Sequence, residues 1–229
     1  MLAHLDNYPY VGIIVGMELG RPLRLVTPTV DGDVLSALAR ADAEFTPPQV
    51  AELIGMWSVE GVRNCLRRLV DQGIVVARAA GKGSLYRLNR DHLAAPAIVA
   101  LAMLRQTFVD RLREDLDGWS TACVYAAMFG SAARGSMRPD SDIDLFVVRP
   151  KGVDPDDDAW RGQLEGITQR STSWTGNDTR ILEFSDDEVK AGLANDEPVL
   201  LDIARDGVRL AGPTSYLRNL RRKSAGAPR

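Results

Sequence analysis

The stretch "FGSAARGSMRPDSDIDLFVV", residues 129–148, joins a turn of small residues to two aspartates that open an apolar run. The apolar residues before it predict a strand that ends at Phe129 and delivers Gly130 and Ser131 into a tight turn. Glycine lets a phosphate approach the backbone, and the serine hydroxyl and nearby N–H groups bond phosphate oxygens. The turn therefore predicts a triphosphate site, with Arg134 placed to offset phosphate charge.

The two aspartates of the same stretch, Asp142 and Asp144, lie two residues apart at the start of a predicted strand. Side chains alternate along a strand, so both carboxylates point to one face while Ile143 faces the core. Carboxylate oxygens are hard ligands that suit Mg²⁺. The pair therefore predicts a divalent cation site a few residues from the phosphate turn.

Gly130-Ser131, ten intervening residues, and Asp142-x-Asp144 followed by "LFVV" together resemble the signature of the DNA polymerase beta-like nucleotidyltransferases. The likeness is to their minimal nucleotidyltransferase branch, and it is strongest over residues 124–148 and extends over 119–184. It implies a mixed sheet flanked by helices. It also implies Mg²⁺-dependent (or Mn²⁺-dependent) transfer of a nucleotide from an NTP to a hydroxyl, with AMP from ATP as the favoured case.

The resemblance implies a third acidic residue on a later strand, for which "NDTRILEF" is the candidate segment. Asp178 and Glu183 are an odd number of residues apart, so only one of them faces the metal. We favour Glu183 as the third metal-binding and catalytic carboxylate, because a carboxylate embedded among apolar residues needs a reason. Alignment of the strand patterns also allows Arg180 to fall at this position, which would leave a degenerate site that binds nucleotide but transfers poorly.

The N-terminal part predicts three helices and a hairpin. Helical spacing begins at Asp33, Thr46 and Ser58 are candidate caps for the next two helices, and "IVVARAAGKGSLYRLN" reads as two strands around a glycine-rich tip. This order resembles winged helix-turn-helix domains of the MarR and ArsR type. The resemblance implies binding to duplex DNA. The residues expected to contact it are Arg63, Arg67, Arg68 and Lys82.

The predicted fold class is α+β, with a winged helix-turn-helix domain, a linking helix and a polymerase-beta-like nucleotidyltransferase domain with a mixed sheet. Its five segments are an arm or strand over 1–30, the winged helix over 31–95, one linking helix over 96–118, the transferase domain over 119–223 and a flexible tail over 224–229.

Composition narrows the class of protein further. The formal charge of -3 argues neither for nor against a local basic face, and residues 46–92 hold seven Lys and Arg against four acids. Cys65 and Cys123 belong to no cluster with metal-ligand spacing, so no zinc site or disulfide framework is expected. The sequence has no apolar run of about 18 residues and no secretory leader pattern, so we expect a cytoplasmic protein.

Three functions fit these patterns. The first is a transferase that modifies a partner protein and also binds DNA. The minimal branch includes antitoxins that adenylylate a HEPN-type toxin, which makes such a toxin the first candidate acceptor. The second is a transcription regulator whose transferase-like domain only senses nucleotide, and the third is a small-molecule transferase of the aminoglycoside type. A homodimer is expected for DNA binding.

Overall fold

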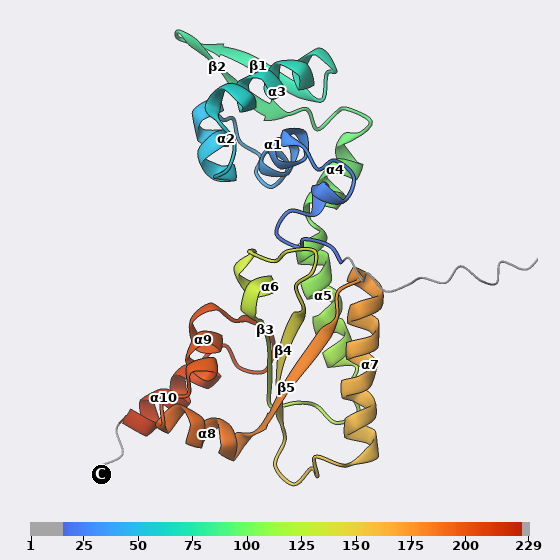
Figure 1. Cartoon of the computed structure of the whole chain (residues 1–229), viewed down its shortest axis with the longest axis vertical. Helices are drawn as coiled ribbons and strands as arrows, with labels where there is room; N and C mark the ends of the chain where they lie inside the picture. Colours follow the sequence, from blue (N-terminus) through green and yellow to red (C-terminus); the bar gives the residue numbers. More distant parts are fainter. Residues whose placement is uncertain (1–15, 226–229) are drawn as a thin grey trace, which may run out of the picture.

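A computed structural model describes residues 16–225, and it folds into an N-terminal and a C-terminal lobe joined at a narrow waist (Figure 1). The N-terminal lobe contains three helices followed by an antiparallel hairpin. These elements are α1 (Val30–Ala39), α2 (Pro47–Ile54), α3 (Val59–Asp71), β1 (Val75–Ala80) and β2 (Gly83–Leu88). The order matches the predicted sequence of elements.

Side-chain caps fix the starts of two of these helices. Thr46 and Gln49 form a capping box at α2, and the Ser58 hydroxyl accepts a hydrogen bond from the Gly61 N–H at α3. The inner face of α3 packs against α1, so Leu38 and Leu66 are fully buried in the core of this lobe.

The linking segment differs from the single helix predicted for 96–118. It forms α4 (Ala95–Ala102) and α5 (Leu104–Asp117), which are separated at Met103. The break follows from packing: α4 buries Ala102 in the N-terminal core, whereas α5 buries Phe108 and Leu112 in the C-terminal core.

The N-terminal segment also differs from prediction where it is described. "RPLRLV" contains a 3-10 helix, η1 (Pro22–Leu25), and not a strand. Leu23 packs in the N-terminal core, whereas Leu19 packs in the C-terminal core. The segment from Leu19 to Leu23 therefore contributes to both lobes. The first half of the arm or strand predicted for 1–30, residues 1–15, lies outside the described residues.

The C-terminal lobe has a four-stranded mixed sheet in the order β5-β4-β3-β6. β4 runs parallel to β5 and antiparallel to β3, and β3 runs antiparallel to β6. The elements of this lobe after α5 are β3 (Tyr125–Phe129), α6 (Gly130–Arg134), β4 (Ile143–Arg149), α7 (Asp158–Thr175), β5 (Thr179–Ser185), α8 (Asp186–Ala194), α9 (Pro198–Asp206), β6 (Val208–Ala211) and α10 (Tyr216–Ala225).

Helices cover both faces of this sheet (Figure 1). α5 and α7 pack on the face that carries Leu145 and Val147, and α8, α9 and α10 pack on the face that carries Phe146 and Val148. The mixed sheet confirms the predicted α+β class. α10 continues to Ala225, so the start of the basic tail is helical, and 226–229 lie outside the described residues. Within residues 16–225, none of the helices combines the length and apolar character needed to cross a bilayer.

Candidate active site

The phosphate turn and the aspartates meet at the end of the sheet that faces the N-terminal lobe. At this end β3 finishes and β4 and β5 begin (Figure 1). β3 and β4 pair so that Phe129 lies directly opposite Asp144. Gly130, the next residue, begins the short helix α6. The strand register therefore brings the turn and the second aspartate together.

Contact between Gly130 and Asp144 is close. Gly130 has φ +68°, in the left-handed region, and a Cβ at this position would lie 2.5 Å from Oδ2 of Asp144. Only glycine meets both conditions without strain, since it has no Cβ and adopts positive φ freely. The glycine at 130 thus leaves room for the Asp144 carboxylate and sets the direction of the turn.

Ser131 is half-buried in the first turn of α6. Its carbonyl oxygen accepts the N–H of Gly135 and of Ser136, which closes the turn. Gly135 ends the helix with φ +71°. The hydroxyl of Ser131 has no protein hydrogen-bond partner in the part of the chain that the structure describes, so it remains available to a ligand.

Arg180 lies beside the aspartate pair. β4 and β5 pair so that Asp144 lies opposite Arg180, and directly paired residues share a face of the sheet. A guanidinium nitrogen of Arg180 lies 2.9 Å from Oδ2 of Asp142. Arg180 is 72% exposed, so this ion pair is open to solvent and its arginine is free to move toward a ligand.

Burial raises the pKa of the Asp144 carboxyl, and the negative charge of Asp142 raises it further. The positive charges of Arg180 and Arg134 act in the opposite direction. Arg134 is exposed at the end of α6. The site therefore holds two carboxylates that repel each other and two arginines that offset them.

This donor set fits one divalent cation. Two carboxylates on one face supply hard oxygen ligands, and a cation would relieve the repulsion that raises the pKa of Asp144. Mg²⁺ is commonly held by one or two carboxylates together with substrate phosphates and water. Among residues 16–225, no group of three or more His, Cys, Asp or Glu side chains is arranged to hold a metal.

Glu183, the residue favoured as the third carboxylate, is not brought to the aspartates. It pairs with Val147 and so lies on the opposite face of the sheet from Asp144. Its Oε1 accepts hydrogen bonds from Nε of Arg149 at 2.8 Å and from Nε1 of Trp160 at 2.9 Å. Glu183 therefore has a buried partner set of its own, which explains a carboxylate among apolar residues.

Asp178 directly precedes β5, and strand alternation assigns it to the face of Arg180. Its carbonyl oxygen accepts the N–H of Ile143 at 2.8 Å, so its backbone lies beside the start of β4. The side chain is exposed. Of the two acidic candidates in this segment, Asp178 is thus on the face of the aspartate pair.

The four basic residues expected to bind DNA lie in the N-terminal lobe. Arg63 is on α3 and Lys82 is at the hairpin tip, and both line one groove of about 530 Å³. Arg63 and Arg67 are 47% and 61% exposed, and both lie within ion-pair distance of Glu60. Arg68 pairs instead with Asp31 of α1 at 2.6 Å, which turns it away from that groove.

The chain was compared with curated sequences and with solved structures. No curated protein sequence matches the chain. Among solved structures, the chain is similar to a toxin–antitoxin with AMP-PNP, at 17% identity and a TM-score of 0.34, over 52% of this chain and 83% of that one. It is also similar to the toxin–antitoxin MntA–HepT, at 16% identity and a TM-score of 0.33, over 52% of this chain and 83% of that one.

The family model described as a nucleotidyltransferase domain matches residues 109–186. This range begins within α5 and ends at the start of α8. Every residue of the candidate active site, from Gly130 to Arg180, falls inside it. The chain therefore carries a nucleotidyltransferase domain over residues 109–186.

Proposed function

We propose that the C-terminal lobe binds a nucleoside triphosphate with one divalent cation and transfers its nucleotidyl group to a hydroxyl of a partner protein. The observation that carries the proposal is the contact between Gly130 and the Asp144 carboxylate. It makes the phosphate turn and the aspartate pair one site, inside the segment that matches a nucleotidyltransferase domain.

Each part of the site has a task in this reaction. Asp142 and Asp144 would hold Mg²⁺ or Mn²⁺, which, when bound, would offset the phosphate charge and stabilise the negative charge on the phosphoryl oxygens. The Gly130-Ser131 turn binds the triphosphate through backbone N–H groups and the serine hydroxyl. Arg134 and Arg180 supply the positive charge that keeps the triphosphate and two carboxylates together.

The chemical step forms one bond and breaks one. The acceptor hydroxyl oxygen bonds to the α-phosphorus, and the bond from that phosphorus to the oxygen bridging to the β-phosphate breaks. Pyrophosphate leaves, and the hydroxyl proton passes to water. ATP is the donor we propose, and a HEPN-type toxin is the acceptor, because the spacing of Gly130-Ser131 and Asp142-x-Asp144 resembles that of the minimal nucleotidyltransferases.

Transfer is tested with α-³²P-labelled ATP, Mg²⁺ and a purified HEPN-type toxin as acceptor. The double variant Asp142→Asn with Asp144→Asn is expected to lose about a thousandfold in rate, since roughly 4 kcal/mol of transition-state stabilisation is removed. The matched control is Asp156→Asn with Asp158→Asn, an exposed pair with the same spacing at the start of α7. Equal rates in the two double variants would exclude this site.

A second candidate function is nucleotide sensing without transfer, and Arg180 favours it. An arginine opposite Asp144 supplies no metal ligand and accepts no proton. Calorimetry with a non-hydrolysable ATP analogue, run beside the transfer assay, separates the two functions. Tight binding without label transfer, for any hydroxyl acceptor offered, would favour sensing.

We further propose that the N-terminal lobe is a winged helix-turn-helix module that binds duplex DNA as a homodimer. The support is the order of its elements and the groove shared by Arg63 and Lys82. Fluorescence anisotropy with the protein's own promoter tests this, and the triple variant Arg63→Ala, Arg67→Ala, Lys82→Ala is expected to bind more weakly with a lower salt slope.

Arg161→Ala, an exposed arginine of the other lobe, is the matched control. Binding that is equal for promoter and scrambled duplex, and equal in the triple variant, would assign the lobe to protein docking instead. Sedimentation of the free protein and of the complex reports the oligomeric state.

A further inference from the structure

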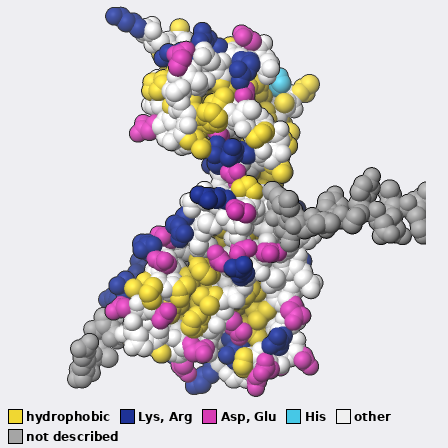
Figure 2. All heavy atoms as spheres, in the orientation of Figure 1, with side chains coloured by type: hydrophobic (Ala, Val, Ile, Leu, Met, Phe, Trp, Pro, Cys, Tyr) yellow, Lys and Arg dark blue, Asp and Glu magenta, His cyan; other side chains and the backbone are white. Residues whose placement is uncertain are grey.

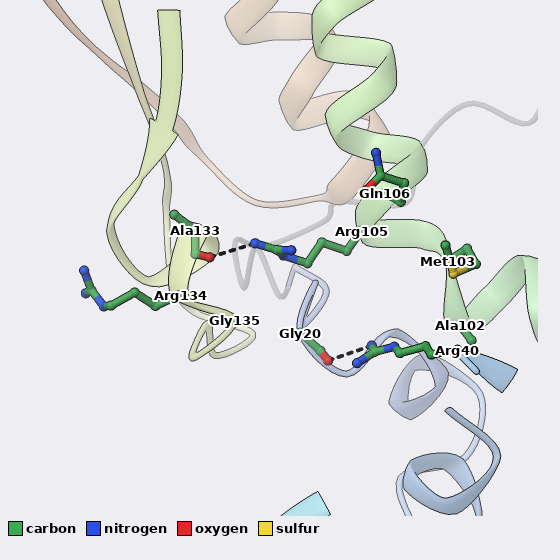
Figure 3. A pocket seen from close by; sticks show the side chains of 9 residues that line it. All are labelled: Gly20, Arg40, Ala102, Met103, Arg105, Gln106, Ala133, Arg134 and Gly135. Carbon is green, nitrogen blue, oxygen red and sulfur yellow. Dashed lines mark hydrogen bonds between the residues drawn. The ribbon is translucent and has the colours of Figure 1, made fainter. Parts of the chain in front are cut away.

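A cavity of about 530 Å³ lies between the two lobes, beside the candidate active site, with which it shares Arg134 (Figure 3). Its walls come from the end of α1, the junction of α4 and α5, and α6. Three of its lining residues are arginines: Arg40 from the N-terminal lobe, and Arg105 and Arg134 from the C-terminal lobe. Figure 2 shows Lys and Arg side chains at this waist.

Positive charge in this cavity is not neutralised by its lining. None of the described residues that line it is Asp or Glu. The neighbouring cavity shares Arg40 and contains one acidic residue, Asp33, whose buried carboxylate is already paired with Arg21. Burial lowers the pKa of the Arg40 guanidinium, the charge of Arg105 lowers it further, and the charge of Asp33 acts in the opposite direction.

Most of the hydrogen-bond donors of Arg40 and Arg105 are unused. Each guanidinium carries five N–H donors. Arg105 donates from Nη2 to the Ala133 carbonyl at 2.7 Å, and Arg40 donates from Nη2 to the Gly20 carbonyl at 3.1 Å. Nε of Arg105 is buried and has no hydrogen-bond partner in the described part of the chain. A buried donor without an acceptor is costly, so an acceptor on a ligand is favoured there.

We propose that this cavity binds a small phosphate-bearing anion, held by Arg40 from one lobe and Arg105 from the other. Guanidinium groups bind phosphate oxygens through paired, charge-assisted hydrogen bonds. The cavity volume suits a ligand of nucleotide size or smaller. Arg134 takes no part in holding the anion, because its side chain turns away from Arg40 and Arg105 (Figure 3) and its charge acts on Asp144.

This site is connected to the candidate active site through α6. Arg105 holds the carbonyl of Ala133, one residue before Arg134 and three after Gly130. An anion that draws the Arg105 guanidinium into the cavity therefore acts on the helix that carries the phosphate turn. Because the anion also contacts Arg40 of the N-terminal lobe, its binding links the two lobes.

Calorimetry of the full chain with inorganic pyrophosphate, in EDTA, tests the proposal. Without divalent cations the aspartate pair repels phosphate, so binding under these conditions reports the arginine cavity. We expect pyrophosphate to bind and the double variant Arg40→Gln with Arg105→Gln to weaken it by about tenfold or more, because charge-assisted hydrogen bonds are lost. Asp142→Asn with Asp144→Asn is expected to leave pyrophosphate binding unchanged. The test of the arginine cavity can therefore succeed or fail independently of the transferase proposal.

Arg161→Gln with Arg222→Gln is the matched control, since both arginines are exposed and far from the cavity in the sequence. ADP is titrated in parallel, and tighter binding of ADP than of pyrophosphate would identify a nucleotide as the ligand. No binding of either anion to the unaltered chain, or equal binding by both double arginine variants, would overturn the proposal.

A footprint on the unaltered chain guards against loss of folding in the variants. Phenylglyoxal modifies guanidinium groups, and mass spectrometry reports the extent at each arginine. We expect pyrophosphate to protect Arg40 and Arg105 while Arg161 reacts as before. Equal modification with and without pyrophosphate at all three would contradict the proposed site.

Discussion

Replacing Gly130 by alanine probes the contact that joins the phosphate turn to the aspartate pair. Two effects add at this position. The left-handed backbone, with φ +68°, costs an alanine about 1–2 kcal/mol. The new Cβ would also lie 2.5 Å from Oδ2 of Asp144, and forced repacking of this kind costs about 1–3 kcal/mol. We therefore expect Gly130→Ala to lower the free energy of unfolding by roughly 2–5 kcal/mol.

Gly152→Ala is the matched control for the backbone effect alone. Gly152 has φ +88°, and a Cβ there would meet nothing within 4 Å. Its loss is expected to be about 1–2 kcal/mol. Urea unfolding followed by tryptophan fluorescence measures both variants, and Trp119, Trp160 and Trp174 all report on the C-terminal lobe.

Nucleotide binding separates the two glycines further. An Asp144 carboxylate displaced by the new methyl group no longer meets a cation beside Asp142, so Gly130→Ala is expected to bind a non-hydrolysable ATP analogue with Mn²⁺ about tenfold or more weakly, a loss of about 1.4 kcal/mol. Gly152→Ala is expected to bind as the parent does. If the two variants lost equal stability and bound nucleotide equally, the close approach of Gly130 to Asp144 would have no part in the site.

Three other predictions concern the carboxylates and arginines of the same lobe. Arg180→Asp is expected to raise Mn²⁺ affinity by about tenfold or more in calorimetry, because it frees Asp142 and adds a third carboxylate. Arg180→Gln only frees Asp142 and should show a smaller gain in affinity. No gain in Arg180→Asp would contradict the strand register. Glu183→Gln is expected to cost about 1–3 kcal/mol in urea unfolding, because Arg149 loses its charged partner, while leaving nucleotide binding unchanged. The raised pKa of Asp144 means that its protonated form is favoured in the folded chain, so its contribution to stability is present at low pH and is lost as pH rises through the folded pKa. Metal-dependent nucleotide binding, measured by calorimetry over a range of pH, should fall as pH drops through that raised pKa, and binding that is independent of pH there would contradict the role of Asp144.

Local sequence was sufficient to place the Gly130-Ser131 turn beside the two aspartates. Gly130, Asp142 and Asp144 lie within 15 residues, and strand alternation alone places both carboxylates on one face. The helix starts at Thr46 and Ser58 were predictable for the same reason, because a cap contacts backbone only three residues away.

The residue that stands beside the aspartates as a third partner could not be predicted from local sequence, because it depends on the register between β4 and β5. A parallel pair is joined by a long crossover, here through α7, and its register is fixed by the packing of both faces. The apolar neighbours of Glu183 indicated that its carboxylate needs partners, but those partners are Arg149 and Trp160, not a metal beside the aspartates. Only the pairing of Asp144 with Arg180 shows which face each residue takes.

Hydrophobic periodicity also could not predict which residues pack in which lobe. Residues 96–117 carry a continuous apolar stripe, yet the helix breaks at Met103 because each half buries its stripe in a different core. Leu19 and Leu23 lie only four residues apart and also divide between the two cores. The chain therefore crosses the waist twice, once before η1 and once at Met103, and two crossings restrain the lobes more than one flexible linker would. A C-terminal fragment that began after residue 95 or 118 would lack Leu19, which is fully buried in the C-terminal core. It would also lack one wall of the arginine cavity. The lobe that carries the candidate active site is thus completed by residues that precede the N-terminal lobe in sequence.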